Sequence, residues 1–238
     1  MLPTAGAQSL TRSGTPLPIR GIVRPLQQAM IAADISARIA AIRFREAQGF
    51  KKGDRLVEFD CERLEAEAAA ADALWRETKL SLESNSYLEK RGAAGRIDVE
   101  ISRARADKAG SEAAALKARL KQCVIIAPYD GRVAELTINE HEFPSAGKPF
   151  ISIVATGEFE IDLIVPSHWL KTLTPGATFT FAVDETGQSH AAHVLRIGAA
   201  VDPVSQTVKV IATFLEKGRA VLPGMSGTAT FAKTDGAP

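Results

Sequence analysis

Two stretches of the chain, read in opposite directions, carry the same spacing of apolar and small residues. Forward from Cys61 these residues recur alternately three and four positions apart, and the same spacing runs backward from Cys123. This alternation is typical of a coiled-coil seam. In every facing pair the two residue numbers add up to 184. A constant sum means that one number rises as the other falls, so the two helices must be antiparallel. The pairs are 61 with 123, 64 with 120, 68 with 116, 71 with 113, 75 with 109, 78 with 106, and 82 with 102.

The middle of this pairing falls at Gly92, so the sequence predicts an α-helical hairpin over residues 61–123 with its tip near 91–95. Gly92 and Gly95 supply the glycines that such a turn favours. At 1.5 Å per residue, about 28 residues per helix give a rod on the order of 40 Å long. A rod with so little core of its own favours contact with a partner. The alternative is a helix pair that only decorates a domain.

A repeated β-pattern surrounds the predicted hairpin. Residues 37–46 match residues 131–140 at an offset of 94 positions, with the same apolar alternation and no gap. Each copy predicts a strand, a loop, a turn and a strand, which is too little to bury a core alone. We therefore expect residues 21–60 and 124–155 to fold together as one β-domain. Its expected turn residues are Gly53, Asp130, Gly131 and Gly147.

Residues 156–233 show several short alternating segments, separated by turn residues and one brief helical piece. This pattern predicts a small closed β-barrel. Residues 1–20 are rich in Ser, Thr, Pro and Gly and are expected to be a flexible segment, with residues 234–238 as a tail. No export signal or membrane anchor is visible in this chain. The expected fold class is mixed α and β, with several domains.

Composition excludes some functions. The net charge of +1 and the lack of a basic block argue against nucleic-acid binding. The two cysteines are too few for a disulfide framework and lack the spacing of a zinc site. Because the constant sum places Cys61 opposite Cys123, they form either a disulfide at the hairpin base or two thiols in a core layer.

We identify no catalytic residue, metal site or cofactor. His190 and His193 are three apart in a probable strand and so point to opposite faces, which suits solvent-facing histidines better than ligands. Trp169 can anchor an interface or plug the barrel. Lys51 and Lys52 are predicted either to lie in a solvated turn or to form a contact between subunits.

Four segments together carry a resemblance: "IIAPYDGRV" at 125–133, its matching half before the helices, "VDPVSQTVKV" and "LPGMSGTATF". They are similar to the periplasmic adaptor, or membrane fusion protein, family of bacterial tripartite efflux and secretion systems, whose members are hemolysin-secretion-D-like. The resemblance covers roughly residues 21–233. It implies a lipoyl-like β-domain in two halves, interrupted by a coiled-coil hairpin and followed by a β-barrel.

The resemblance also implies a function. Such a chain is a non-enzymatic periplasmic adaptor, associated with the inner membrane, that serves the export of small molecules or other substrates. Its implied partners are an inner-membrane transporter of resistance-nodulation-division, ABC or major-facilitator type and an outer-membrane channel protein. A homo-oligomer, trimer or hexamer, is expected. The implied tip contacts are Leu88, Arg91, Gly92 and Gly95.

Departures from the family pattern keep an alternative open. Many members that dock on a channel have Arg, Leu and Ser around the tip; Leu88 fits, but Ser84 and Gly95 stand in the other two places. The membrane-proximal domain of many members is also not seen in this chain. The alternative is a scaffold or interaction protein without channel docking. A lipoyl or biotinyl carrier is disfavoured because the helices replace the tight hairpin that would expose the modified lysine.

Overall fold

The computed structural model describes residues 18–145, 147–216 and 221–231. The chain forms two compact units. The first unit comprises Gln27–Ala155, and the second combines the described residues before Gln27 with those after Ala155. The predicted mixture of α and β structure, with a β-barrel and two long helices, is confirmed.

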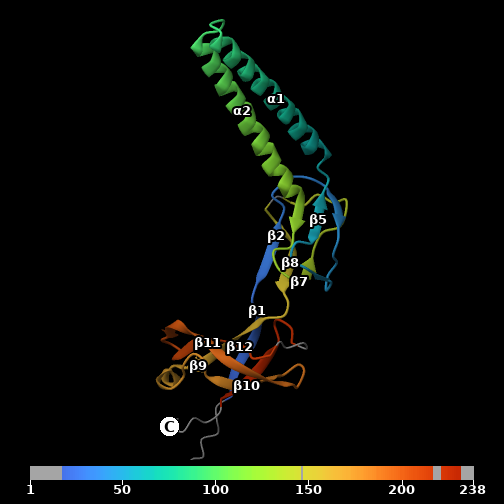
Figure 1. The fold of residues 1–238 in the computed structure, drawn as a ribbon. Helices are drawn as coiled ribbons and strands as arrows, with labels where there is room; N and C mark the ends of the chain where they lie inside the picture. Colours follow the sequence, from blue (N-terminus) through green and yellow to red (C-terminus); the bar gives the residue numbers. More distant parts are fainter. Residues whose placement is uncertain (1–17, 146, 217–220, 232–238) are drawn as a thin grey trace, which may run out of the picture. The chain divides into compact units, whose positions relative to one another are not determined.

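Six strands of the described part of the second unit close into an antiparallel barrel, in the order β1-β13-β10-β11-β12-β9 (Figure 1). Alternate residues point inward, as Ile161 and Leu163 do in β9. Trp169, in the short 3-10 helix η2 (Ser167–Lys171), packs on this core and meets Phe231 edge to face at 5.5 Å. The strands are β1 (Ile19–Pro25), β9 (Phe159–Pro166), β10 (Thr178–Val183), β11 (Ser189–Asp202), β12 (Thr207–Phe214) and β13 (Ser226–Phe231).

Strand β1 corrects two predicted boundaries. We expected the flexible segment to run to residue 20 and residues 21–60 to belong to the split β-domain. Instead β1 begins at Ile19 and pairs with β9 and β13 of the barrel. Gly21 fits there because a Cβ at this position would lie 2.5 Å from Leu163 Cδ2. Residues 1–17 and the predicted tail 234–238 lie outside the described residues.

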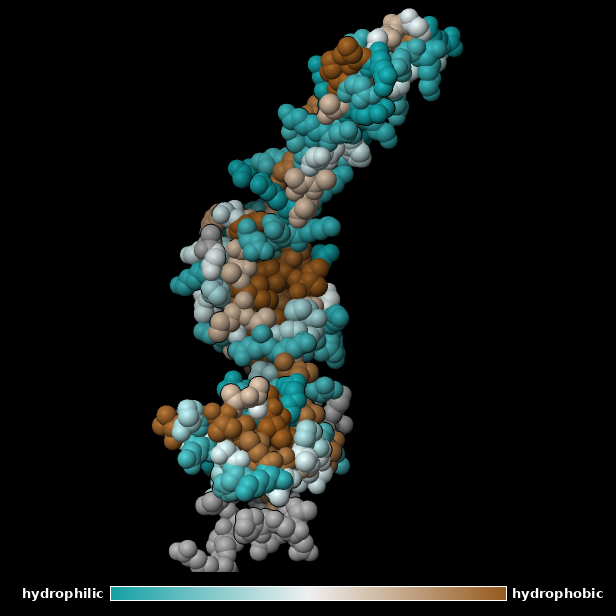
Figure 2. Space-filling view, turned by 90° about the vertical axis from the view of Figure 1, so that its left-hand side faces the viewer, coloured by the Kyte–Doolittle hydropathy of each residue, from teal (hydrophilic) through white to brown (hydrophobic). Residues whose placement is uncertain are grey.

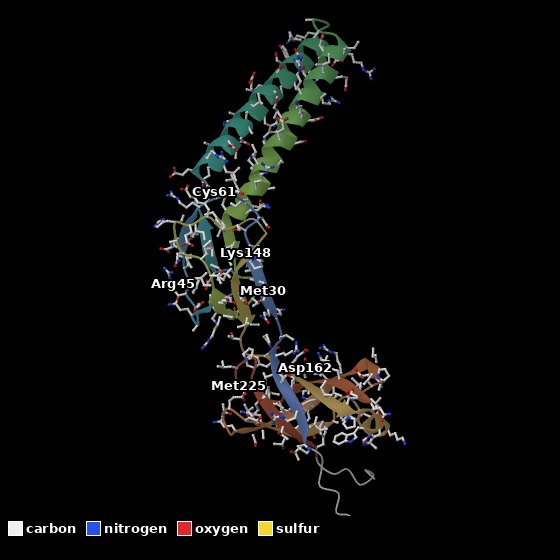
Figure 3. All side chains as sticks on the ribbon, turned by 180° about the vertical axis from the view of Figure 1, so that it is seen from behind. Met30, Arg45, Cys61, Lys148, Asp162 and Met225 are labelled. Carbon is white, nitrogen blue, oxygen red and sulfur yellow. A yellow bond between two sulfur atoms is a disulfide. The ribbon has the colours of Figure 1, made fainter. Side chains whose placement is uncertain are left out.

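A charge cluster holds β1 to its neighbours. Asp162 of β9, labelled in Figure 3, has its Oδ2 atom 2.5 Å from Arg24 Nε of β1 and 2.8 Å from Lys209 Nζ of β12. The Asp162 side chain is only 10% exposed, and it is joined to both cations by charge without a hydrogen bond of ordinary geometry. A carboxylate this enclosed needs such partners. Three adjacent strands are therefore fixed through one residue.

The first unit contains two small sheets, one of four strands in the order β2-β8-β7-β4 and one of three in the order β3-β5-β6. Their side chains share one core, in which Ile39, Leu56 and Ile153 are fully buried. The strands are β2 (Gln28–Ala32), β3 (Ile39–Ile42), β4 (Gly49–Phe50), β5 (Arg55–Phe59), β6 (Val124–Ile126), β7 (Gly131–Leu136) and β8 (Pro149–Ala155).

The two sequence repeats exchange strands between these sheets. Strand β2 pairs with β8, and β6 pairs with β5, so each sheet is completed by the other half of the unit. Strands β5 and β8 begin at Arg55 and Pro149, which are separated by the offset of the repeat. Neither half can complete its sheet alone, so the segment between them is an insertion and does not divide the unit.

That insertion is the helix pair. Helices α1 (Glu62–Lys90) and α2 (Arg96–Leu120) follow β5 and run side by side in opposite directions (Figure 1). Their sequences are rich in Ala, Glu, Arg and Leu, which are strong helix formers. The 3-10 helix η1 (Lys121–Cys123) returns the chain to β6. No helix in the described residues combines the length and the apolar character that crossing a bilayer would require.

Candidate partner-binding site

The contact between α1 and α2 is made mainly of small residues. Small side chains let two helices approach closely, but they interdigitate little and leave the register weakly specified. The register must therefore come from the few bulky or polar residues along the contact. The buried residues are Ala68 on α1 and Val99, Ser102, Ala106, Ala109 and Ala113 on α2.

One register-fixing cluster lies in the middle of the pair. The Trp75 indole covers Gly110, where an added Cβ would lie 2.9 Å from Trp75 Nε1. Lys117 extends over the same ring, 5.8 Å from its centre, and donates a 2.5 Å hydrogen bond to Asp72 Oδ1. That hydrogen bond lowers the pKa of the Asp72 carboxyl. Sequence reasoning paired Trp75 with Ala109 and did not single out Gly110, the residue next to it, whose missing side chain gives the indole room.

A second polar contact lies closer to the tip. Asn85 Nδ2 donates to Ser102 Oγ at 2.5 Å, and Ser102 is only 4% exposed. A buried polar pair in a helix contact favours one register because sliding the helices would leave its groups unpaired. Sequence reasoning missed it, because the pairing placed Leu82 opposite Ser102. The polar character of both residues was the available signal.

The turn between the helices is held by backbone hydrogen bonds. The N–H groups of Arg91 and Ala93 both donate to the Leu88 carbonyl oxygen, at 3.1 and 2.9 Å. Gly92 has φ +74°, a left-handed conformation that glycine adopts without strain. Gly95 precedes the first residue of α2, and its N–H donates to Asp98 Oδ2 at 3.2 Å.

The four predicted tip residues are thus brought together at this turn. Leu88 is 38% exposed although it is apolar. The Arg91 guanidinium lies 4.7 Å from the centre of the exposed Tyr87 ring, which favours a cation–π contact. Gly92 and Gly95 shape the backbone and present no side chain. The end of the helix pair therefore offers apolar and cationic groups on a well-defined turn.

The opposite end of the helix pair is closed covalently. The Sγ atoms of Cys61 and Cys123 are joined in a disulfide, with their Cα atoms 6.2 Å apart (Cys61 is labelled in Figure 3). Of the two readings that the sequence left open, the structure has the disulfide. Both cysteines are buried in the core of the first unit. The bond joins the start of α1 to the end of η1 and encloses both helices in one loop.

The expected turn residues of the split β-domain serve two purposes. Gly53 and Gly147 have φ +93° and +71°, and both occupy turns. Gly131 is instead the first residue of β7, where an added Cβ would lie 2.4 Å from the Val154 carbonyl oxygen. Its prediction as a turn residue is therefore wrong. Space within the sheet, and not a positive φ, requires glycine there.

Asp130 links the two halves of the same unit. Its carboxylate accepts a hydrogen bond from the Lys52 N–H at 2.8 Å and another from Lys51 Nζ at 3.3 Å. These bonds, the first above all, lower the pKa of Asp130. The two lysines precede the helices in sequence and Asp130 follows them, so this contact ties one repeat to the other.

The described residues contain no group of three His, Cys, Asp or Glu side chains arranged to hold a metal ion. His190 does not face solvent as expected. Its ring packs edge to face on Phe214 at 5.6 Å, and its Nε2 atom is buried without a hydrogen-bond partner among the described residues. His193 Nδ1 is also buried and unpaired there. The adjacent strand pairing explains this burial, which no local sequence pattern reveals.

Comparison with known families adds to this description. The family model described as RND MFP, barrel-sandwich hybrid domain, matches residues 27–156, more than half of the chain. The chain belongs to this membrane fusion protein family. The match spans the first unit with its inserted helix pair, so the exchanged sheets and the helices both lie within the matched region.

Two curated relatives of this membrane fusion protein are each 26% identical to it. One is an uncharacterized protein of Haemophilus influenzae, aligned over 226 residues or 94% of this chain. The other is the nodulation protein NolF of Rhizobium meliloti, with an alignment 216 positions long that covers 84% of this chain. The chain spans 59% of the length of each relative.

A solved structure supports the fold. The MacA–MexA chimeric protein, which contains the α-hairpin domain of Pseudomonas aeruginosa MexA, aligns with a TM-score of 0.78 and 17% identity. The alignment covers 90% of this chain and 79% of that chain. The barrel, the exchanged sheets and the helix pair therefore recur together in another protein.

Proposed function

We propose that this membrane fusion protein is the periplasmic adaptor subunit of a multicomponent transporter. It links an inner-membrane transporter to an outer-membrane channel for the export of small molecules or other substrates. The observation that carries this proposal is the inserted helix pair, whose far end exposes Leu88 and Arg91 on a fixed turn. Membership of the membrane fusion protein family supports the same conclusion.

In this proposal each part of the chain has a role. Residues 27–60 and 124–155 form the lipoyl-like domain, α1 and α2 form its coiled-coil hairpin, and the barrel is a separate domain. The hairpin tip contacts the channel, while the lipoyl-like and barrel domains contact the transporter and neighbouring subunits. The chain acts in the periplasm, next to the inner membrane, and works by assembly without catalysis. Transport energy comes from the partner pump, of resistance-nodulation-division, ABC or major-facilitator type.

An alternative is a scaffold protein with the adaptor fold that contacts no channel. The specific observation in its favour is the tip sequence, in which Ser84 and Gly95 replace the Arg and Ser expected from the family pattern. The two proposals differ in one measurable respect. Only an adaptor recovers both a transporter and a channel protein from membranes.

The test is affinity capture from membranes of the organism that makes the protein, followed by identification of the captured proteins. The intact chain should recover a transporter and an outer-membrane channel. Leu88→Asp should lose the channel and keep the transporter, because a charge at the tip opposes an apolar contact.

Ser81→Asp is the matched control. Ser81 is exposed on α1, one heptad before Leu88 and away from the tip, so this variant should retain both partners. Recovery of a transporter without any channel from the intact chain would favour the scaffold. Recovery of neither partner would exclude the adaptor.

A further inference from the structure

A pocket of about 760 Å³ opens at the base of the helix pair, within the first unit. Cys61, labelled in Figure 3, lies where the chain passes from β5 into α1 and lines this pocket. Where the helices join the sheets, Figure 2 shows hydrophobic residues set among hydrophilic ones. The volume of the pocket lies in the range that small-molecule sites occupy.

The walls of the pocket come from four segments that are distant in sequence. They are the connection between β2 and β3, the start of α1, the end of α2 with η1, and the connection between β7 and β8. The disulfide between Cys61 and Cys123 fixes the two helical walls to each other. Arg38, on the β2–β3 connection, donates a 2.7 Å hydrogen bond to Asp60, just before α1. The pocket is therefore formed without a ligand, which lowers the cost of binding one.

Four of the charged residues around the pocket neutralise one another in pairs. The hydrogen bond from Arg38 lowers the pKa of the Asp60 carboxyl, so this acid stays charged and paired. Arg63 Nε lies 3.6 Å from Glu67 Oε1, one turn further along α1. These two ion pairs contribute no net charge to the pocket.

Two charged side chains of opposite sign are left over. Neither Asp34 nor Arg119 has an ion-pair or hydrogen-bond partner for its side chain among the described residues, so they do not pair with each other. The Ser36 and Gln122 side chains, which also line the pocket, are likewise without a partner there. The β2–β3 connection thus offers an unpaired acid with a neighbouring hydroxyl. The α2–η1 wall offers an unpaired base with a neighbouring amide.

The same pocket has an apolar part. Ile35, Leu64 and Phe143 line it, and the first two also pack against the core of the first unit. Phe143 is 69% exposed. The loop that carries it is held in place, because the Glu142 carbonyl oxygen accepts a hydrogen bond from the Ile39 N–H at 2.9 Å. A large aromatic ring held open to solvent in this way offers apolar contact to a ligand.

These groups together match a zwitterion with an apolar body. A free ammonium group suits Asp34, and a carboxylate can take two parallel hydrogen bonds from the Arg119 guanidinium. The side chains of Ser36 and Gln122 can each donate and accept a hydrogen bond, as a peptide group requires. A simple ion would leave one of the two charges unmatched, and a neutral apolar molecule would leave both.

We propose that this pocket binds a short apolar peptide with free termini. The ammonium group of the peptide pairs with Asp34, its carboxylate pairs with Arg119, and its side chains contact Phe143. The bound peptide bridges the β2–β3 connection and the helices, so it stabilises the junction between the helix pair and the sheets. The pocket lies at the opposite end of the helix pair from Leu88, so binding does not depend on channel docking.

Calorimetric titration of the purified full chain with the dipeptide phenylalanyl-leucine tests the class of ligand. The dipeptide with both termini free should bind saturably. Acetylation of its amino group and amidation of its carboxylate should each weaken binding about tenfold, since each removes one charged hydrogen-bonding group. Diglycine keeps both charges but has no apolar side chain, and it should also bind about tenfold more weakly.

Substitutions in the chain assign each terminus of the dipeptide to its partner. Arg119→Gln should weaken binding of the free dipeptide about tenfold and leave binding of the amidated form unchanged, because that form has no carboxylate. Asp34→Asn should weaken binding of the free dipeptide to the same extent and leave the acetylated form unchanged. The matched controls are Arg105→Gln and Asp107→Asn, at exposed positions of α2 outside the pocket, and they should have no effect.

The absence of saturable binding, or equal affinity for the free and the blocked dipeptides, would overturn the proposal. A loss of affinity on blocking only one terminus would also overturn it, since the pocket would then be a site for a simple ion. The same holds if Arg119→Gln has no larger effect than Arg105→Gln. The titration involves no transporter or channel, so peptide binding and the proposed adaptor function can fail separately.

Discussion

Gly110 lies beneath the indole of Trp75, and the absence of a side chain at Gly110 is what lets the ring lie across the contact between α1 and α2. The remaining buried residues of this contact are mostly alanines, which other alanines could replace after a shift along the helix. The Trp75–Gly110 contact therefore specifies the register in the middle of the helix pair.

Filling the space beneath the indole should destabilise the helix pair. Gly110→Leu is expected to lower the free energy of unfolding by about 1–3 kcal/mol, because the new side chain displaces Trp75. In a Trp75→Ala background the same change should cost much less, since leucine then fills the space left by the indole. Urea unfolding followed by helical circular dichroism measures both values. Ala114→Leu, on the exposed surface of α2, is the control and should be nearly neutral.

Removing the disulfide should weaken the first unit. Cys61 and Cys123 are 62 residues apart in sequence, and closing a loop of that length stabilises a protein by about 4 kcal/mol in the chain-entropy model. Cys61→Ser with Cys123→Ser should lower the helix-monitored urea midpoint. Fluorescence of Trp169 with Trp75 replaced by Phe should report an unchanged barrel. An unchanged midpoint for the helices would show that the disulfide contributes nothing to stability.

The polar pair near the tip should show strong coupling. Asn85→Ala leaves the buried Ser102 hydroxyl without its partner and should cost about 1–3 kcal/mol. Adding Ser102→Ala should recover part of this loss, because no polar group then stays buried and unpaired. Thermal unfolding of the two single variants and the double variant gives the coupling energy. Additive effects would mean that the hydrogen bond does not form in solution.

Acid should weaken the contact between the two repeats. The hydrogen bonds from Lys52 and Lys51 hold the pKa of Asp130 below its ordinary value of about 3.9. Its stabilising effect is therefore complete above that value and is lost as the pH falls through the lowered pKa. Asp130→Asn should reduce the melting temperature of the first unit at pH 6, and the difference from the unaltered protein should shrink by pH 2.5. A difference independent of pH would contradict this assignment.

Most of the helix pair and much of the first unit could be predicted from the sequence, because both depend on regularly spaced residues. The three-and-four alternation placed the turn at 91–95 and set Cys61 opposite Cys123, where the structure has a disulfide. The repeat offset of 94 placed β5 and β8 correctly relative to each other. These features are periodic within short segments, so one sequence is enough to find them.

What the sequence did not reveal depends on contacts between distant residues. Ile19 lies in a segment whose alternation resembles any strand, and only its pairing with Ala229 assigns it to the barrel. Gly131 was taken for a turn residue because nothing local indicates the nearby Val154 carbonyl. Asn85 forms a hydrogen bond with Ser102, but the sequence pairing considered only apolar and small residues and therefore left Asn85 out.

Strand β1 is translated long before the strands that it pairs with in the barrel. The partners of Gly21 and Val23 in β9, Leu163 and Ile161, are translated some 140 residues after them, and β13 comes later still. Every strand of Gln27–Ala155 is translated before either partner of β1 exists. The barrel can therefore close only after the whole first unit has been translated, and until then β1 has two unpaired edges that a chaperone or another nascent chain could occupy.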